Sequence, residues 1–590
     1  MSDYPVGVLL RSHTEKLAVA SDSRLFHAMT AMEMATKYGL PSGLSIVVDE
    51  GFRLVGIITD GDIREAQLKG FDINSPVTDV MTREPVVIFD GTPAKDVLDE
   101  IRRQIRESGR IRTIGHAVLV DPSRRVLGLV DVSRLASSQS WHWDTVGVIG
   151  LGYVGLTIAV SLAEMGFEVI GWDRHEEVRA GLRRGASHVY EVGLEGVLKA
   201  QLEKGRFLVA SSYTDLKRCR CFLICVNTLV NDAAVPDLTQ LEAAVAELIS
   251  NLKAGDLIVL RSTVPVGTCR NLVKKAIDTK TDFLVGKDLG LAFAPERTVE
   301  GRALEEIRTL PQVIGGINDW STEATARIFS KLSPTVVRVD TLEEAEFVKL
   351  VNNAFRDLSF AFANEIAMMC EAYNLNSVKI IKAANSGYPR NPISLPSPGV
   401  GGTCLKKDPY ILASAESKRD GVPSLSEIGR RINEKVPGRI ARRLLDALEE
   451  CGKKPSQCTV FVLGFAFKGE PETTDMRGSS TLDLVEMLRP EVASIRGYDP
   501  IVPKDEVART GVVWKEIEEG FSGADAVVFM TNHRSFTAVD VYGLAERMRR
   551  PAIFFDGWHL FELDAIERVS GVRYMGMGYM TPWTEKSVAS

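Results

Sequence analysis

The stretch VGVIGLGYVGLTIAVSLAEMGFEVIGWDRH, residues 146–175, decides the fold of the larger part of this chain. It begins as a short apolar strand, turns through a run of glycines, continues with apolar residues at helical spacing, and returns to a second apolar strand. A strand, glycine-rich turn, helix and strand in this order are typical of a dinucleotide-binding sheet. The stretch therefore predicts an α/β fold with a doubly wound parallel sheet.

The glycine-rich turn predicts where a dinucleotide binds. Gly150 permits the tight turn, Gly152 lets the backbone approach a pyrophosphate, and Gly155 lets helix and strand pack closely. The helix that opens with Tyr153 and Val154 offers backbone N–H donors and a partial positive charge. These five residues form the predicted cradle for the phosphates.

Asp173 decides which dinucleotide is expected. It ends the second strand, 21 residues after Gly152, where a carboxylate can accept hydrogen bonds from the adenosine ribose hydroxyls. A carboxylate in this place also repels a 2′-phosphate. The sequence therefore predicts NAD rather than NADP.

Composition excludes several classes of protein. The net charge of −7, with 71 basic against 78 acidic residues, gives no basic excess for a nucleic acid partner. No run approaches the ~20 apolar residues of a membrane span, so we expect a cytoplasmic protein without a membrane partner. Eight cysteines without a CxxC pair fit reduced thiols better than disulfides or a metal site.

The 590 residues divide into several predicted domains. Strands alternate with helices after the opening stretch, long helices follow from residue 342, and a second strand, loop and helix begin near residue 458. We predict two Rossmann-like doubly wound domains joined by a central domain of long helices, preceded by an α+β pair. The predicted bounds are residues 1–140, 145–340, 341–440 and 441–580.

The first 140 residues contain a loose repeat. LSIVVDEGFRLVGIITDGDIREA, residues 44–66, is echoed by HAVLVDPSRRVLGLVDVSRLA, residues 116–136, and both predict strand, turn, strand and helix start. The pair resembles tandem CBS domains, which often bind adenine nucleotides. Thr59 and Asp62 match the family's ribose-holding pattern, whereas the second half lacks that aspartate. The resemblance implies one adenosine site at most, with purely structural packing as the alternative.

A cysteine loop carries the candidate chemistry. In PSPGVGGTCLKKDPY, residues 396–410, Cys404 follows glycines and precedes two lysines. Cationic neighbours favour the reactive thiolate. Lys349 and Asn353 are four residues apart and share one helical face. Thr263, Glu296 and Glu300 follow predicted strands, at the edge where such sheets bind ligands.

These motifs together resemble the nucleotide-sugar 6-dehydrogenases, over roughly residues 145–575. The motifs are GVIGLGYVGL, CVNT, RSTVPVGT, APERTVEG, EFVKLVNNAF, GVGGTCLKKDPY, VLGFAFKGEPETTDMR and YDP. The resemblance implies that a sugar C6 alcohol is oxidised twice with two NAD⁺. It also implies a thiohemiacetal and a thioester on the cysteine. The helical stretch that begins at residue 342 runs for over thirty residues without glycine or proline, and its length suggests a dimer contact, so we expect a homodimer or higher homo-oligomer.

The resemblance assigns a role to each matching residue. Cys404 is the nucleophile, Lys349 stabilises oxyanions, and Asn353 orients the substrate. Asp408 with Thr263 organises water and proton transfer, and Glu300 assists hydrolysis. Further residues approach NAD or contact the substrate. Those near NAD are Thr228, Thr263, Lys407 and Arg477, and those near the substrate are Glu296, Lys349, Asn353, Arg390, Gly401 and Lys468.

The cysteine motif also favours one class of sugar. Its PSPGVGG lead and DPY tail are similar to those of family members acting on UDP-N-acetylhexosamines. We expect UDP-N-acetylglucosamine or UDP-N-acetylmannosamine, as a precursor of surface polysaccharide. UDP-glucose and GDP-mannose are the alternatives within the family. A hydroxyacid-type dehydrogenase and a non-catalytic nucleotide sensor are alternatives from other classes.

Overall fold

The computed structural model describes residues 9–10, 13–38, 40–41, 43–93, 96–97, 100–101, 103–104, 115–132, 145–231, 234–390, 392–415 and 422–582. The chain forms two compact units, Met1–His142 and Trp143–Ser590. None of the helices in the described ranges is both long and apolar enough to cross a membrane.

The first unit repeats one small motif, as the sequence predicts. Each half pairs a short strand in parallel with the first strand of an antiparallel hairpin. The two hairpins share an irregularity in register, at Val47/Val48 and at Leu119/Val120. The strands are β1 (Leu9–Leu10), β2 (Ala18–Ala20), β3 (Leu44–Val48), β4 (Leu54–Thr59), β5 (Val87–Phe89), β6 (His116–Val120) and β7 (Val126–Asp131). The helices include α1 (Leu25–Ala35), α2 (Asp60–Leu68) and α3 (Val77–Val80).

The second unit begins with an eight-stranded sheet in the order β10-β9-β8-β11-β14-β15-β16-β17, parallel except between β15 and β16. The central strands are buried on both faces, which explains their continuous apolar sequence. The strands are β8 (Thr145–Ile149), β9 (Glu168–Trp172), β10 (Phe207–Val209), β11 (Cys221–Ile224), β14 (Leu257–Leu260), β15 (Gly290–Phe293), β16 (Gln312–Gly316) and β17 (Val336–Val339). The helices include α6 (Tyr153–Glu164), α7 (Glu176–Arg183), α8 (Leu194–Glu203), α9 (Thr239–Ile249), α10 (Lys275–Lys280), α11 (Ala303–Thr309) and α12 (Asp319–Phe329).

A second sheet near the C-terminus has the matching order β20-β19-β18-β21-β22-β23-β24. The predicted pair of doubly wound domains is confirmed. The strands are β18 (Thr459–Leu463), β19 (Ser494–Tyr498), β20 (Val513–Trp514), β21 (Ala526–Phe529), β22 (Ala552–Asp556), β23 (Val572–Gly576) and β24 (Tyr579–Met580). The helices include α17 (Ser480–Leu488), α18 (Lys504–Arg509), α19 (Ile517–Phe521), α20 (Val541–Ala545) and α21 (Leu563–Ile566).

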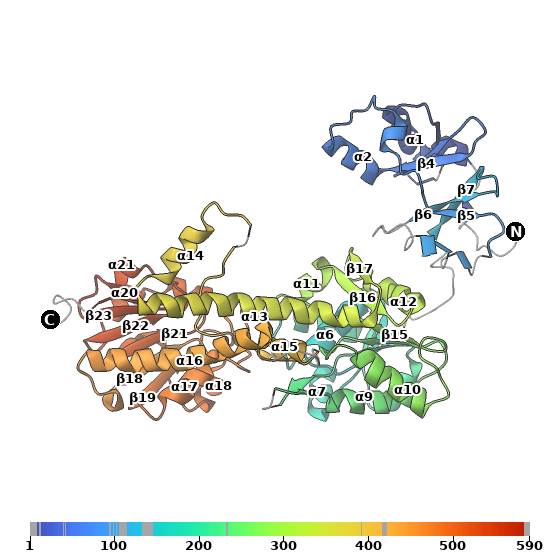
Figure 1. Cartoon of the computed structure of the whole chain (residues 1–590). Helices are drawn as coiled ribbons and strands as arrows, with labels where there is room; N and C mark the ends of the chain where they lie inside the picture. Colours follow the sequence, from blue (N-terminus) through green and yellow to red (C-terminus); the bar gives the residue numbers. More distant parts are fainter. Residues whose placement is uncertain are drawn as a thin grey trace. The chain divides into compact units, whose positions relative to one another are not determined.

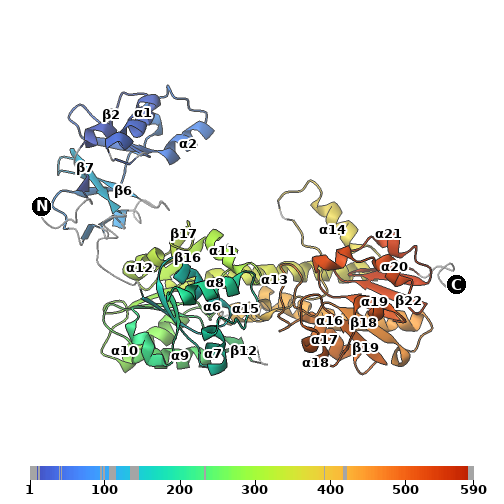
Figure 2. The ribbon, with the colours of Figure 1, turned by 180° about the vertical axis from the view of Figure 1, so that it is seen from behind.

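A long helix, α13 (Leu342–Ala372), runs from one sheet domain to the other (Figures 1 and 2). Its start is fixed by a capping box, in which Thr341 and Glu344 exchange side-chain and backbone hydrogen bonds. Helix α14 (Ser377–Asn385) follows it, and α15 (Thr403–Ser414) and α16 (Leu425–Glu450) pack against it. The central helices therefore connect the two sheet domains.

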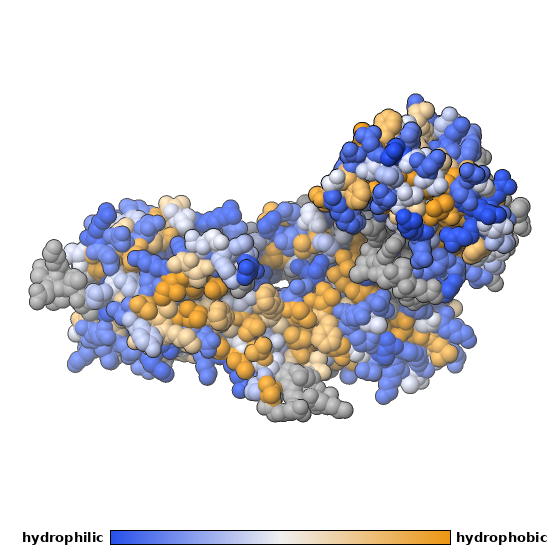
Figure 3. All heavy atoms as spheres, turned by 45° about the horizontal axis from the view of Figure 1, so that its top comes forward, coloured by the Kyte–Doolittle hydropathy of each residue, from blue (hydrophilic) through white to orange (hydrophobic). Residues whose placement is uncertain are grey.

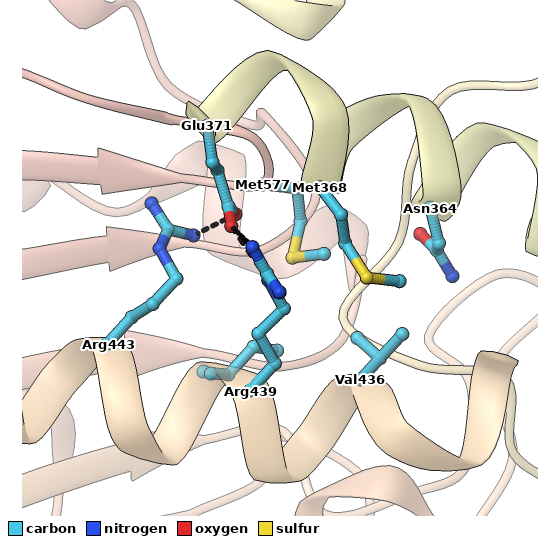
Figure 4. A pocket seen from close by; sticks show the side chains of 8 residues that line it. Asn364, Met368, Glu371, Val436, Arg439, Arg443 and Met577 are labelled. Carbon is cyan, nitrogen blue, oxygen red and sulfur yellow. Dashed lines mark hydrogen bonds and ion pairs between the residues drawn. The ribbon is translucent and has the colours of Figure 1, made fainter. Parts of the chain in front are cut away.

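Ion pairs at two places along α13 hold it to α16. Near its middle, Asp357 and Arg430 lie 2.7 Å apart, each side chain 1% exposed, and Arg430 also donates to the carbonyl of Val400 in the cysteine loop. Near its end, Glu371 pairs with Arg439 and Arg443 (Figure 4). The α13–α16 packing thereby supports both the cysteine loop and the second sheet domain.

We expect Arg430→Met to destabilise the protein, because it leaves the Asp357 carboxylate buried without its cation. Breaking one side of a buried pair costs about 3–5 kcal/mol. The expected result is a clear fall in the denaturation midpoint, measured by circular dichroism in urea. Arg431→Met is the matched control, because the Arg431 side chain is 65% exposed and its ion pair with Glu427 is a surface one. Equal midpoints for the two variants would contradict the prediction.

Candidate active site

The glycine-rich turn after β8 has the geometry of a phosphate cradle. Gly150 has a φ of +89°, and a Cβ on Gly155 would lie 1.7 Å from the Gly150 carbonyl oxygen. A Cβ on Gly152 would meet no atom within 4 Å, so the space in front of it is open. Helix α6 begins directly afterwards with Tyr153 and Val154. These residues fit a dinucleotide, whose pyrophosphate would lie over Gly152.

Asp173 follows β9 beside this turn. Its carboxylate accepts hydrogen bonds from the backbone N–H groups of Leu151 and His175, each at 2.9 Å. The first of these bonds joins the acid to the glycine-rich turn. The predicted ribose acceptor is therefore held in place next to the predicted phosphate cradle.

Three more predicted residues follow neighbouring strands. Thr228 comes after β11, and its hydroxyl donates to the carbonyl of Thr263, which comes after β14. Glu296 follows β15, where its buried carboxylate pairs with Arg261. Burial opposes its ionisation, but Arg261 and the N–H of Thr298 lower the pKa of Glu296 below its usual value. This carboxylate is thus ionised and already paired.

Helices α13 and α15 meet at a buried carboxylate. Asp408 is fully buried, and it accepts from the Asn353 amide at 2.6 Å and pairs with the Lys407 ammonium at 2.8 Å. Lys349 lies one turn before Asn353 on α13, and its positive charge acts on Glu296. Four predicted residues therefore come together where the central helices reach the first sheet.

Cys404 is the second residue of α15, one turn before Asp408. It is exposed, whereas the other seven cysteines, all of them described, are buried or half-buried. The glycine before the helix, Gly402, has a φ of +87° and donates to the carbonyl of Gly478 at 3.2 Å. Gly401 also lies against this segment, because a Cβ on it would be 2.8 Å from the Gly478 carbonyl oxygen. The cysteine loop is therefore bonded to the second sheet domain.

The second sheet domain contributes Arg477 and Lys468. Arg477 pairs with Asp475 at 2.7 Å and lies close enough to Cys404 for their charges to interact. Lys468 donates to the backbone carbonyl of Glu300. Burial raises the pKa of Glu300 to about 7 and lowers the pKa of Lys468 to about 8. An acid and an amine that titrate near neutrality thus meet at the domain junction.

Arg390 lies apart from this group. It is exposed, and its guanidinium stacks 5.6 Å from the ring of Tyr388. Among the residues that the structure describes, no contact joins Arg390 to the cysteine loop. Its predicted place against the substrate stays a prediction.

Thr59 and Asp62 lie in the first unit, where they form the capping box of α2. The Asp62 carboxylate accepts from the Thr59 backbone N–H at 2.8 Å and from its hydroxyl at 2.7 Å. The same side chains therefore begin a helix, whether or not a nucleotide binds there.

Several neighbours of the site were not predicted from the sequence. Arg261, which pairs with Glu296, begins the RSTVPVGT motif, and a charged residue directly after an apolar strand is a signal that could have found it. Asp475, near Glu300, lies within the motif VLGFAFKGEPETTDMR beside Arg477, whereas Glu191, also near Glu300, stands in a segment without a strand or a spacing to mark it. Only the folded chain brings them to the site.

The second sheet domain repeats the turn of the first. Gly464 has a φ of +91°, and its N–H donates to the Tyr498 carbonyl at 2.8 Å, as that of Gly150 does to Trp172. Asp499 follows β19 and accepts from the N–H of Phe465 at 2.6 Å. Both domains therefore use one glycine and one acid in the same arrangement.

A dinucleotide cradle in one domain, a cysteine loop bonded to the other, and titratable groups at their junction define a nucleotide-dependent oxidoreductase. The chain belongs to the UDP-glucose/GDP-mannose dehydrogenase family. Residues 144–333 match the family's NAD binding domain, 343–435 its central domain and 461–563 its UDP binding domain. Residues 12–69 and 77–139 match CBS domains. The predicted family, its NAD cofactor and the CBS pair are confirmed.

Similar proteins include enzymes named for N-acetylated sugars. The chain is 34% identical over 433 residues to UDP-N-acetyl-D-mannosamine dehydrogenase of Pyrococcus horikoshii, covering 73% of this chain and 99% of that one. It is 32% identical to NDP-N-acetyl-D-galactosaminuronic acid dehydrogenase of Ralstonia nicotianae, covering 68% and 94%. A solved structure of the UDP-D-ManNAc dehydrogenase from Pyrococcus horikoshii aligns with a TM-score of 0.67 at 34% identity, covering 74% and 99%.

We expect Gly152→Ala to weaken NAD binding without unfolding the chain, because its Cβ would enter open space that the pyrophosphate needs. The expected result is an unchanged melting temperature and at least a roughly tenfold higher Kd for NAD, or about 1.4 kcal/mol, by calorimetry. Gly196→Ala is the control, since its Cβ also meets no atom within 4 Å but lies in α8. Wild-type affinity in Gly152→Ala would show that NAD does not approach this glycine.

Proposed function

We propose that the protein oxidises the C6 alcohol of a UDP-N-acetylhexosamine to the carboxylate, reducing two NAD⁺ per sugar. The observation that carries the proposal is the contact of Asn353 with Asp408 between α13 and α15. Cys404 and Lys349 each lie one turn before a partner in this contact, so a nucleophile and a cation are held on the helices that meet there. A thiol is required only if the aldehyde is oxidised further.

The residues of this chain support each step of a four-electron oxidation. NAD⁺ bound at the glycine-rich turn would accept one hydride in each oxidation. The alcohol would first lose a hydride to the bound NAD⁺ and its hydroxyl proton to a water organised by Asp408 and Thr263, which gives an aldehyde. The Cys404 sulfur then bonds to the aldehyde carbon, and the carbonyl electron pair becomes an oxyanion that the Lys349 ammonium stabilises. Loss of a second hydride from the same carbon leaves a thioester on Cys404.

Hydrolysis of the thioester needs a base and a positioned water. Water adds to the thioester carbon, the C–S bond breaks, and the carboxylate leaves while the thiol returns. Glu300 supports this step in our proposal, because its pKa of about 7 lets it take a proton from water near neutral pH. Asp408 bonds both to Asn353, which orients the substrate in our proposal, and to Lys407, which approaches NAD. It thereby keeps these two side chains in place relative to one another.

The names of the relatives support an N-acetylated sugar. The two relatives described above act, by their names, on UDP-N-acetyl-D-mannosamine and on an N-acetyl-D-galactosamine derivative. We propose UDP-N-acetylmannosamine first and UDP-N-acetylglucosamine second. The product is a nucleotide-activated acidic sugar, which is the kind of donor that surface polysaccharide assembly consumes.

An exposed apolar face supports the predicted homo-oligomer. On α13 it comprises Phe347, Val351, Phe355, Phe362 and Met369, and Phe355 is 71% exposed. Apolar side chains gather along the middle of the second unit in Figure 3, and a groove of about 480 Å³ lies between α13 and the start of α16. We propose that a second copy of the chain covers this face, and light scattering would give its mass in solution.

We expect two NADH per molecule of UDP-N-acetylmannosamine consumed, because the thioester route takes four electrons. Cys404→Ala should lower this turnover at least about 10³-fold, since no covalent adduct can form. The measurement is absorbance of NADH against sugar consumed, beside UDP-N-acetylglucosamine and UDP-glucose. Cys451→Ala is the control, as Cys451 ends α16 outside the site. One NADH per sugar, or turnover indifferent to Cys404, would refute the mechanism.

We propose further that an adenine nucleotide binds at Thr59 and Asp62 and shifts the activity of the enzyme, since a ligand with different affinities for two states couples them. Asp62→Asn should weaken ATP and AMP binding at least roughly tenfold, because the ribose loses a charged acceptor. Calorimetry on the full chain measures this. The control is Asp60→Asn, an exposed acid in the same helical turn. Unchanged binding and an unchanged response of activity to both nucleotides would exclude this site.

A further inference from the structure

Glu191 is a buried carboxylate that takes no part in the proposed oxidation steps. It lies between α7 and α8, and one of its oxygens accepts the backbone N–H of Gly301 at 2.8 Å. The same oxygen accepts the hydroxyl of Tyr153, the first residue of α6. Burial raises the pKa of Tyr153, so the phenol stays protonated and donates. Glu191 therefore connects the glycine-rich turn with the residue that follows Glu300.

The peptide between Glu300 and Gly301 is bonded on both sides. Its carbonyl accepts from Lys468 of the second sheet domain, and its N–H donates to Glu191 of the first. Gly301 has a φ of +92°, and a Cβ on it would lie 2.5 Å from the Glu472 carbonyl oxygen. The backbone that carries Glu300 is thus held between the two domains with no room for a side chain on the next residue.

We propose that Glu191 is a positioning residue that fixes the Glu300 carboxyl for hydrolysis of the thioester on Cys404. The inference rests on the proposed function, because it concerns the step that follows the second oxidation. Glu191 touches neither substrate nor thioester in this scheme. It acts through one hydrogen bond to the Gly301 peptide and through its negative charge.

The hydrogen bond and the negative charge of Glu191 should affect Glu300 in different ways. The pKa of Glu300 is raised to about 7, chiefly by burial and also by the charges of Asp475 and Glu191, while Lys468 and Arg477 oppose the rise. Tyr153, the remaining titratable neighbour, is neutral. Removing the charge of Glu191 while keeping its hydrogen bonds should therefore lower the pKa of Glu300 without displacing the Glu300 carboxyl. Removing the whole side chain should also leave the Gly301 N–H with only its longer hydrogen bond, to the Tyr153 hydroxyl at 3.2 Å.

Two variants test the proposal in the full-length protein. Glu191→Gln keeps an oxygen that can accept from Gly301 and Tyr153 but loses the charge. The acidic limb of its hydrolysis rate against pH should move to lower pH, because the charge that is removed raises the pKa of Glu300. Glu191→Ala loses both, and its hydrolysis rate should fall roughly 10- to 100-fold, as a misplaced group does. The two oxidations should stay fast in both variants.

The measurement is a rapid-quench single turnover with UDP-N-acetylmannosamine and NAD⁺. It follows NADH by absorbance and the acyl group on Cys404 by intact mass. In Glu191→Ala we expect a burst of two NADH per site followed by persistence of the acyl-enzyme. Glu195→Gln is the matched control, because Glu195 is an exposed acid four residues further along, and it should behave as wild type.

The outcomes separate this inference from the proposed function. If wild type makes one NADH per sugar and no acyl-enzyme forms, the proposed function fails and the inference fails with it. If wild type makes two NADH while both Glu191 variants hydrolyse the acyl-enzyme with the wild-type rate and pH profile, only the inference is overturned. Equal slowing of the oxidations and of hydrolysis would show a merely structural role and would overturn it too. Should Glu191→Ala fail to fold, the pH profile of Glu191→Gln decides.

Discussion

The structure depends on how one fully buried carboxylate, Asp408, is satisfied. An unpaired charge in such a place is costly, so the helices that surround it must supply partners. Asn353 of α13 and Lys407 of α15 do so at 2.6 and 2.8 Å. The bond from Asn353 fixes the register of α13 against α15, because a shift of either helix by one residue would turn one of the two side chains away. The positions of Lys349 and Cys404, one turn earlier on each helix, follow from the same bonds.

A second constraint keeps this crossing connected to both sheet domains. Arg430 of α16 neutralises Asp357 of α13 and holds the Val400 carbonyl of the cysteine loop. Glu371, at the far end of α13, pairs with Arg443, which donates to the Gly576 carbonyl of β23. These buried or half-buried ion pairs therefore hold the cysteine loop, α13 and α16 in place relative to one another. Within each sheet domain, the buried apolar side chains of the strands form the core.

The sequence predicts what depends on local pattern. Gly150 and Gly155 predict the turn because only glycine fits a φ of +89° or a contact of 1.7 Å. The family motifs mark Cys404 and Lys349 as candidate catalytic residues by their order along the chain. Glu191 could not be found in this way, since its partners are 38 and 110 residues distant. The Thr59 and Asp62 pair shows the opposite limit. One short pattern serves equally well as a helix cap and as a nucleotide motif.

The two acids that follow the second strands of the two sheets differ in how many of their lone pairs are already used. A carboxylate offers about four acceptor positions. Among the described residues, Asp499 accepts four backbone N–H groups, from Phe465, Ala466, Ile501 and Val502. Asp173 accepts two, from Leu151 and His175. The first domain thus keeps acceptor capacity for ribose hydroxyls, while the second has none left. The same backbone turn therefore differs between the two domains in what its acid can still accept.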